Sequence, residues 1–228
     1  MGGGPMAPET SVRKGDDRQG KDAIILPASR VTGRRYDRIS PLYDFCDRMG
    51  RPEWRKRIFD RTSGEVLEVG VGTGKNFPFY RPGTKVTAID VAPRMLERAR
   101  RRLGEAPTPV RLLLADVQAL PFPAASFDSV IDTFVFCSVP DPVLGLREIA
   151  RVCKPGGLVL LLEHVRAEGR VAGALMDLMN PFMVRVVGAN INRRTVENVR
   201  RAGLNVESVE SLGPGGIIKL ITARPVGT

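Results

Sequence analysis

The sequence predicts an α/β protein with a mostly parallel sheet, helices on both faces and an antiparallel last strand. The first reason is a short apolar run, residues 66–69, that leads directly into a glycine-rich turn. Further apolar runs follow, with room for helices between them. Near the C-terminus, two apolar runs are joined by Gly213-Pro-Gly-Gly216. A tight reversal at these residues makes the final strand antiparallel to its neighbour.

The glycine-rich turn contains Gly70, Gly72 and Gly74, and Glu68 precedes it by two positions. Because glycine lacks Cβ, the turn can bend sharply and bring backbone N–H groups close to a ligand. The G-x-G-x-G spacing differs from the G-x-G-x-x-G spacing of dinucleotide sites. A carboxylate at position 68 would oppose a pyrophosphate, but it suits a ligand with a cationic amino group, such as S-adenosylmethionine.

The second and third predicted strands each lead to an aspartate. Residues 85–90 end in Asp90, whose carboxylate can accept two hydrogen bonds from ribose hydroxyls. Residues 110–115 precede Asp116. Both aspartates have an alternative role as helix caps, because a carboxylate at a strand-to-helix junction satisfies backbone donors.

The fourth predicted strand spans 126–136 and leads to Cys137, and the fifth spans 158–162 and leads to Glu163 and His164. His164 is the only histidine, and the C-terminal end of a buried strand is where open α/β sheets bind ligands. A structural role is the alternative for a lone histidine. A helix from 193 to 202 is expected to end at Gly203, before strands 206–212 and 217–223.

From Tyr36 to the C-terminus, this order of motifs resembles the class I S-adenosylmethionine-dependent methyltransferases. The resemblance implies a Rossmann-like seven-stranded sheet and an N-terminal helical lid. We expect a flexible segment at 1–22 and one domain at 23–228. Within the domain, the lid would be 30–62, the cofactor core 64–164, and an acceptor or membrane insertion 165–192.

The resemblance also implies cofactor contacts. Glu68 and the three glycines would face the methionine part, and Asp90 would bind the ribose. Met95 would pack near the adenine, with packing in the ordinary core as its alternative. For Cys137, a small buried hydrophobic role is the alternative. The expected cofactor-binding residues are Tyr43, Glu68, Gly70, Gly72, Gly74, Asp90, Met95, Asp116, Val117 and Cys137.

Two Tyr-Asp pairs begin at Tyr36 and Tyr43, seven positions apart. On a helix this spacing would bring both rings to one face after two turns. Pro41 argues against a continuous helix, so a lid of short helices with both rings pointing inward is predicted. Alternatively, the rings only pack the lid.

The Tyr-Asp-x-x-x-Pro-x-Tyr-Asp pattern, together with Glu163-His164 and residues 188–192, resembles the soluble bacterial phospholipid N-methyltransferases. Those enzymes convert phosphatidylethanolamine stepwise to phosphatidylcholine. Quinone methyltransferases usually carry an Asn after the Tyr-Asp, which is missing here. The resemblance implies in-line methyl transfer, for which the amine must first lose a proton. The expected catalytic residues are Tyr36, Tyr43, Glu163 and His164, and the expected substrate-binding residues are Tyr36, His164, Arg185, Asn192, Arg193 and Arg194.

Residues 169–187 are largely apolar and are interrupted by Asn180-Pro181. Two short amphipathic helices here would give peripheral membrane binding. The alternative is that they cover the sheet as part of the core.

Charge points to an anionic partner, because 35 basic residues exceed 25 acidic ones and the net charge is +10. A phospholipid surface and nucleic acid both fit this charge. Nucleic-acid methyltransferases that act on exocyclic amines carry an acid-Pro-Pro-aromatic motif, whereas residues 137–141 read Cys-Ser-Val-Pro-Asp. Nucleic acid is therefore disfavoured, and a quinone precursor or other small apolar acceptor is the first alternative. A cofactor-sensing binding protein is a further one.

Three cysteines without a C-x-x-C pair, together with a single histidine, offer no metal site and indicate a reducing compartment. No apolar run reaches the roughly 18–20 residues of a spanning helix. We therefore expect a cytoplasmic, peripherally membrane-associated monomer without a metal.

Overall fold

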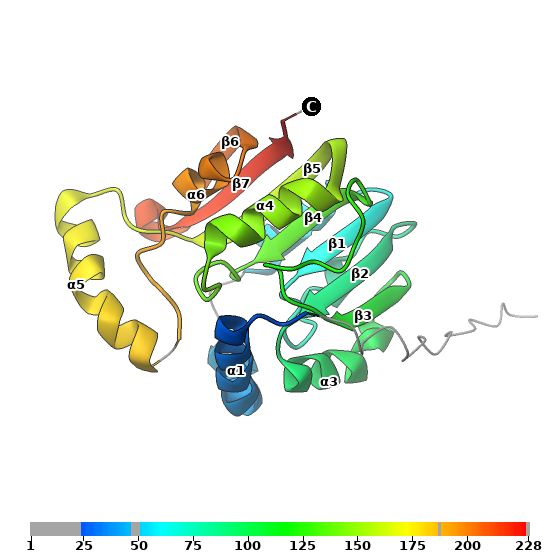
Figure 1. The fold of residues 1–228 in the computed structure, drawn as a ribbon, viewed down its shortest axis with the longest axis horizontal. Coiled ribbons are helices and arrows are strands. Elements are labelled where there is room, and N and C mark those ends of the chain that lie inside the picture. The colour runs from blue at the N-terminus through cyan, green and yellow to red at the C-terminus, as the bar shows by residue number, and fades with distance from the viewer. Residues whose placement is uncertain (1–23, 47–50, 187, 227–228) are drawn as a thin grey trace, which may run out of the picture.

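A computed structural model describes residues 24–46, 51–186 and 188–226, with 38–46 and 214 as backbone only. The predicted flexible segment 1–22 lies outside the described residues. Figure 1 shows the fold.

The sheet in the described part of the chain has seven strands in the order β3-β2-β1-β4-β5-β7-β6. The first five strands in this order pair in parallel, and β7 is antiparallel to both β5 and β6. The order reverses between β1 and β4, and open α/β sheets bind ligands at such a switch point. The predicted class and the antiparallel last strand are confirmed. The strands are β1 (Glu65–Val69), β2 (Lys85–Asp90), β3 (Val110–Leu114), β4 (Phe127–Thr133), β5 (Cys153–His164), β6 (Leu204–Leu212) and β7 (Ile218–Pro225).

Two strand boundaries differ most from the sequence prediction. β4 ends at Thr133 rather than at 136, because Phe134 has a φ of +60° and leaves the extended conformation. β5 begins at Cys153, five residues before the predicted apolar run.

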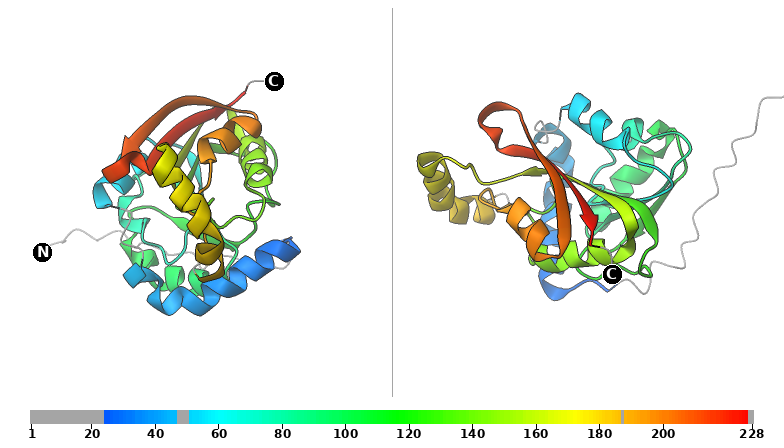
Figure 2. Two further views of the ribbon diagram at one scale, coloured as in Figure 1. Left: turned by 90° about the vertical axis from the view of Figure 1, so that its left-hand side faces the viewer. Right: turned by 90° about the horizontal axis from the view of Figure 1, so that it is seen from above.

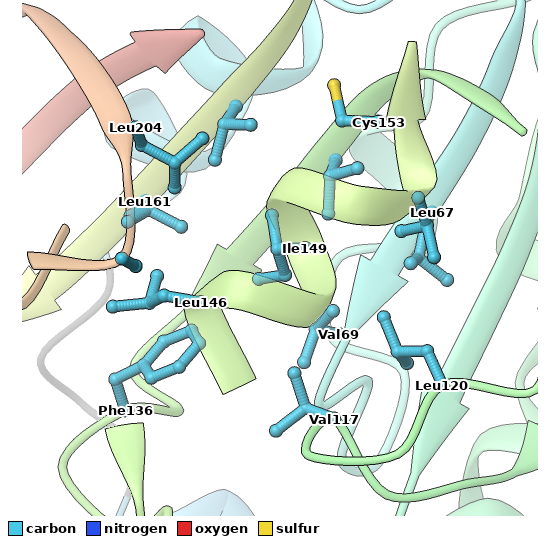
Figure 3. Close-up of a cluster of buried hydrophobic side chains, with 14 of the residues drawn as sticks. Leu67, Val69, Val117, Leu120, Phe136, Leu146, Ile149, Cys153, Leu161 and Leu204 are labelled. Carbon is cyan, nitrogen blue, oxygen red and sulfur yellow. The ribbon is translucent and has the colours of Figure 1, made fainter. Parts of the chain in front are cut away.

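Helices cover both faces of the sheet (Figure 2). Leu146 and Ile149 of α4 (Pro142–Val152) and Val199 of α6 (Thr195–Arg201) are buried on one face, partly drawn in Figure 3. Ile58 of α2 (Pro52–Phe59) and Leu96 of α3 (Pro93–Arg101) are buried on the other. Short 3-10 turns are η2 (Phe77–Phe79), η3 (Leu103–Glu105) and η4 (Pro214–Gly216).

The N-terminal helix α1 (Pro27–Cys46) is continuous through Pro41, so the prediction of several short helices is wrong. Proline inside a helix costs about 3 kcal/mol, which tertiary contacts can offset. Ser29 is buried, and Gly33 packs so tightly that a Cβ there would lie 2.8 Å from the Val91 carbonyl oxygen. These contacts anchor the first half of α1 beside the sheet.

The segment after β5 forms one helix, α5 (Arg170–Val186), rather than two short ones. Pro181 lies inside it, and the Asn180 side chain holds the following chain by accepting a hydrogen bond from the Ile191 amide at 2.9 Å. Gly173 is the one buried residue of α5. The helix stands away from the sheet (Figures 1 and 2), so it does not cover the core. None of the helices in the described residues has the length and apolar character that a membrane crossing needs.

Candidate active site

A cavity lies at the carboxyl ends of β1, β2 and β4. It encloses about 660 Å³ of empty space, including the open mouth. Small-molecule sites have volumes of roughly 300–1,000 Å³. Its walls come from α1, the glycine turn, and the segments after β2, β3 and β4. The lining residues are Ser29, Thr32, Tyr36, Val69, Gly70, Gly72, Asp90, Val91, Met95, Ala115, Asp116, Val117, Thr133, Phe134, Val135, Ser138, Val139 and Pro140.

The glycine turn has a conformation that only glycine adopts readily. Gly70, Gly72 and Gly74 have φ values of +68°, +56° and +83°. A Cβ on Gly70 would lie 2.4 Å from the Val135 side chain. The turn therefore packs directly against the loop after β4, and Gly70 and Gly72 line the cavity while Gly74 does not.

Asp90 lies at the cavity wall at the end of β2. Its Oδ2 accepts a hydrogen bond from the Gly72 amide at 2.9 Å, and its Oδ1 accepts one from the Ala92 amide at 2.8 Å. Burial raises the pKa of Asp90 to about 6, although these amides favour the ionised form. Since each carboxylate oxygen can accept a second hydrogen bond, Asp90 can receive two ligand hydroxyls. Helix capping alone does not explain its place in the cavity.

An apolar region of the cavity can hold a flat ring. Met95 and Val117 are buried and line this region with Ala115, so Met95 belongs to both the core and the cavity. Asp116 also lines the cavity, and its carboxylate accepts hydrogen bonds from the amides of Leu26 at 3.1 Å and Gln118 at 2.9 Å. Asp116 therefore ties the residue that precedes α1 to the cavity rim.

Glu68 is part of a buried polar network. It is fully buried and does not line the cavity. Tyr80 and Asn76 donate hydrogen bonds to its carboxylate, and Arg55 donates to Asn76. Successive strand residues face opposite sides, and Glu68 points to the face covered by α2. Through Asn76 and Tyr80, Glu68 connects β1 to the segment that follows the glycine turn. Its expected place next to the methionine part of the ligand stays a prediction.

Of the two lid tyrosines, only Tyr36 has a described side chain. Tyr36 lines the cavity and shares a side-chain hydrogen bond with Ser138. Burial raises the pKa of the Tyr36 phenol above its usual range, so at neutral pH it is not a proton acceptor. The side chain of Tyr43 lies outside the described residues.

Cys137 does not line the cavity. Burial raises the pKa of its thiol, which contacts the Phe134 carbonyl oxygen at 3.6 Å. Its own carbonyl oxygen accepts hydrogen bonds from the amide of Asn190 at 2.8 Å and from its side chain at 3.0 Å. Cys137 thus joins the loop after β4 to the chain after α5.

The two candidates at the end of β5 also lie behind the cavity wall. Glu163 is fully buried, and its Oε1 accepts hydrogen bonds from the amides of Val135 at 2.6 Å and Phe136 at 2.8 Å. His164 is partly buried, and burial lowers its pKa, so its imidazole is neutral at pH 7. Neither residue lines the cavity.

The predicted substrate residues are dispersed. Arg193 is half-buried, and its Nη2 donates to the Val139 carbonyl oxygen at 2.7 Å. Arg194 is exposed and lies 3.7 Å from Glu197 in an ion pair. Arg185 is exposed on α5, and the Asn192 side chain donates to Asp177 at 3.0 Å.

A second groove adjoins the cavity, because Pro140 lines both. Arg193 lies in this groove together with Arg147 of α4 and Arg201 of α6. Sequence reasoning missed Arg147, Arg201 and also Ser29 and Thr32 of the cavity. These residues belong to segments that are far apart in the sequence, so no local motif marks them as part of a site. Residue type was the only signal in the sequence.

These features fit S-adenosylmethionine in its chemistry. The turn without Cβ atoms leaves room for close backbone approach, Asp90 offers acceptors to ribose hydroxyls, and Met95 with Val117 offers an apolar surface to adenine. A mixed sheet with this site defines a class of proteins that bind an adenosine-containing cofactor.

Comparison with known proteins identifies the class. Residues 67–161 match the family model described as Methyltransferase domain. The chain is 39% identical to phosphatidylethanolamine N-methyltransferase of Cereibacter sphaeroides over 62% of this chain and 72% of that protein. It is 35% identical to demethylmenaquinone methyltransferase of Thermus thermophilus over 68% and 77% of the two chains.

Solved structures agree on the fold. The [4+2]-cyclase SpnF superposes with a TM-score of 0.68 at 20% identity, covering 90% of this chain and all of that one. A methyltransferase from Thermotoga maritima gives a TM-score of 0.65 at 21% identity, with 85% and 99% covered. The chain belongs to the class I S-adenosylmethionine-dependent methyltransferases, and its cofactor is S-adenosylmethionine. Within the described residues, no group of three or more His, Cys, Asp or Glu side chains could hold a metal ion.

Proposed function

We propose that this methyltransferase is a phospholipid N-methyltransferase that methylates phosphatidylethanolamine stepwise toward phosphatidylcholine at a membrane surface. The similarity to the Cereibacter sphaeroides enzyme supports this acceptor. The observation that carries the proposal is the exposed apolar surface of α5.

The apolar surface of α5 is a stripe along one side of the helix. Val171, Leu175, Leu178 and Phe182 are spaced by four, three and four residues, which places them on one face. Val171, Leu178 and Phe182 are 85%, 78% and 63% exposed. An apolar stripe of this kind favours burial in the outer part of a bilayer.

Charge and position strengthen the membrane proposal. Arg170 and Arg185, near the two ends of α5, are exposed and can contact anionic headgroups. The Arg35 guanidinium donates to the Val184 carbonyl oxygen at 2.9 Å, which ties α1 to α5. The residue after Arg35 is Tyr36, in the cavity wall. A lipid held at α5 would thus lie near the helix that closes the cofactor cavity.

The arginine groove is our candidate for the headgroup phosphate. Arg147, Arg193 and Arg201 line this groove together with Asp141 and with Pro140, which also borders the cofactor cavity. Guanidinium groups bind phosphate oxygens through paired hydrogen bonds. In this proposal, Arg147 and Arg201 replace the exposed Arg185 and Arg194 as partners of Arg193.

The reaction requires an amine with a free lone pair. A primary amine with a pKa of about 10.4 must lose its proton at pH 7, at a cost of roughly 4–5 kcal/mol. The bound cofactor supplies an electrophilic methyl group. Tyr36 contributes a neutral ring in the cavity wall, and an aromatic face attracts an increasingly methylated ammonium. Burial within the cavity also favours the neutral amine.

A second acceptor class has independent support. Several demethylmenaquinone methyltransferases are 29–35% identical to this chain, including one from Staphylococcus aureus at 34% over 76% of it. A quinone precursor is apolar and would also approach along α5. It carries no phosphate, so it has no use for the arginine groove.

The test is a direct comparison of acceptors. Purified protein is incubated with labelled S-adenosylmethionine and either phosphatidylethanolamine liposomes or a demethylmenaquinone, and the products are separated by chromatography. We expect label in mono-, di- and trimethylated lipid. Label only in the quinone would contradict the phospholipid proposal and assign the second acceptor class.

A further inference from the structure

A pair of carboxyl groups is buried behind the cofactor cavity at the ends of β4 and β5. Asp132 and Glu163 are fully buried and lie on neighbouring strands (Figure 1). Val130 and Leu161 face the core under α4, and strand residues two positions apart share a face. Asp132 and Glu163 therefore project to the same side of the sheet.

The hydrogen bonds of this pair are incomplete unless a proton lies between the two groups. Glu163 Oε1 accepts from two amides, whereas Glu163 Oε2 and both oxygens of Asp132 have no hydrogen-bond partner of normal geometry in the described structure. The Leu162 backbone amide favours ionised Asp132, but it does not form a hydrogen bond of normal geometry. The two carboxyl groups lie within hydrogen-bonding reach of each other. Two buried carboxylates this close do not both ionise, but one shared proton gives each group a partner.

We propose that Asp132 and Glu163 share one proton and act together as a positioning pair for the loop of residues 134–138, of which Phe134, Val135 and Ser138 line the cofactor cavity. Burial supports this state, because it raises the pKa of both carboxyl groups, that of Glu163 to about 7. The inference concerns cofactor binding and holds for either acceptor class.

The loop that the pair holds is strained and central to the cavity. Phe134 has a left-handed backbone, which costs a non-glycine residue roughly 1–3 kcal/mol. Glu163 binds the next two amides, those of Val135 and Phe136. Val135 packs against Gly70, and Ser138 bonds Tyr36. Loss of the Glu163 contacts would release several cavity contacts at once.

The charged groups near the pair act in different directions. Arg193, whose buried Nε also has no hydrogen-bond partner in the described structure, favours ionised Glu163, and Glu68 on β1 disfavours ionised Asp132. Burial raises the pKa of Cys137 and of Tyr36. The negative charge of Glu163 raises both pKa values further, so both side chains are neutral at pH 7. Lys219 of β7 pairs with Glu163 of β5 in the strand register. Its Nζ donates hydrogen bonds to Glu168 at 2.9 Å and to Ser211 at 2.7 Å.

The experiment measures cofactor affinity against pH without any acceptor. Isothermal titration of S-adenosylmethionine is carried out between about pH 6 and about pH 9 on wild type, Glu163→Gln and Asp132→Asn. In each variant an amide N–H replaces the shared proton. We expect wild-type affinity to weaken by about tenfold as the pair ionises with rising pH. The affinities of both variants should follow a flatter profile.

Glu168→Gln is the matched control, because Glu168 is a nearby exposed carboxylate and should keep the wild-type profile. The melting temperature of each unliganded protein, measured over the same pH range, reports the pair independently of binding. If Glu163→Gln and Asp132→Asn fold but keep the wild-type pH profile, the shared proton is wrong. If Glu163→Gln binds S-adenosylmethionine as weakly as Glu163→Ala, the positioning role is also wrong, because the amide retains the acceptor for both loop N–H groups.

Discussion

The phenol hydroxyl of Tyr80 donates a hydrogen bond to the carboxylate of Glu68 beneath the glycine turn. Both side chains are buried, and the Tyr80 ring packs on Phe59 and Phe77 with centroid distances of 5.1 and 5.5 Å. Burial raises the pKa of Glu68, while the bonds from Tyr80 and Asn76 oppose that rise. A buried polar network therefore lies next to the glycine turn that lines the cavity.

Tyr80→Phe tests this network. The change keeps the ring but removes a donor to a buried carboxyl group, which costs about 1–3 kcal/mol. We expect the free energy of unfolding, measured in urea, to fall by that amount. Ser126→Ala is the control, since Ser126 donates to the Pro123 carbonyl oxygen at the surface and its loss should matter little. Equal stability of the two variants would contradict a stabilising role for this network.

Gly70→Ala tests the contact between the glycine turn and the loop after β4. The new methyl group would overlap the Val135 side chain, and we expect S-adenosylmethionine affinity to fall by about tenfold or more. Gly83→Ala is the matched control, because Gly83 also has a positive φ, of +83°, but open space around its Cβ position. It should lose stability without losing cofactor affinity. Equal loss of affinity in both would show that backbone strain alone is responsible.

Asp90 gives cofactor binding a pH dependence. Its pKa is about 6, so the carboxylate is ionised at pH 7 and gains a proton as the pH falls through 6. Protonation removes acceptor capacity for ribose, and affinity measured by titration calorimetry should weaken below pH 6. Asp90→Asn should bind at least about tenfold more weakly and lose this dependence. An unchanged profile in the variant would assign the titration to another group.

The same Asp90 carboxyl group gives the folding stability a pH dependence of the opposite sign, so that stability falls as the pH rises. Its folded pKa is raised from 3.8, so its contribution to stability is present below about pH 4 and is lost as the pH rises through about 6. In the unliganded protein, a thermal denaturation series should show this loss on raising the pH. Saturating cofactor should reduce it.

The α5 stripe can be changed without touching the core. Leu178→Gln and Phe182→Gln replace exposed side chains, so the melting temperature and cofactor affinity should stay unchanged. Cosedimentation with anionic phospholipid vesicles should fall severalfold, because buried apolar area contributes about 25 cal/mol per Å². Val209→Gln, on β6, is the control. Unchanged vesicle binding by the α5 variants would exclude α5 as the membrane contact.

The arginine groove distinguishes the two acceptor classes. Arg147→Gln with Arg201→Gln should raise the KM for phosphatidylethanolamine by about tenfold, as expected for lost charge-assisted hydrogen bonds of 1.5–3 kcal/mol. Activity on a quinone acceptor should not change. Arg194→Gln is the control, because Arg194 lies outside the groove. An equal effect of Arg194→Gln would point to general surface charge.

Local patterns determined much of this protein. The apolar runs, the glycine turn and the aspartate at the end of β2 predicted the mixed sheet and the cavity residues Gly70, Gly72 and Asp90. These features are readable because a strand and its turn depend on neighbouring residues. The order of the motifs likewise indicated the family and its cofactor.

Tertiary structure decided what depends on distant contacts. The sequence does not say which face of β1 meets the ligand, and Glu68 points away from the cavity. Pro41 and Pro181 suggested breaks, but α1 and α5 are both continuous. The tight packing at Gly33 anchors α1, and the hydrogen bond to the Asn180 side chain anchors the chain after α5. Asp132 lies beside Glu163, and Arg147 and Arg201 line one groove, only because the sheet and its covering helices bring together segments that are far apart in the chain.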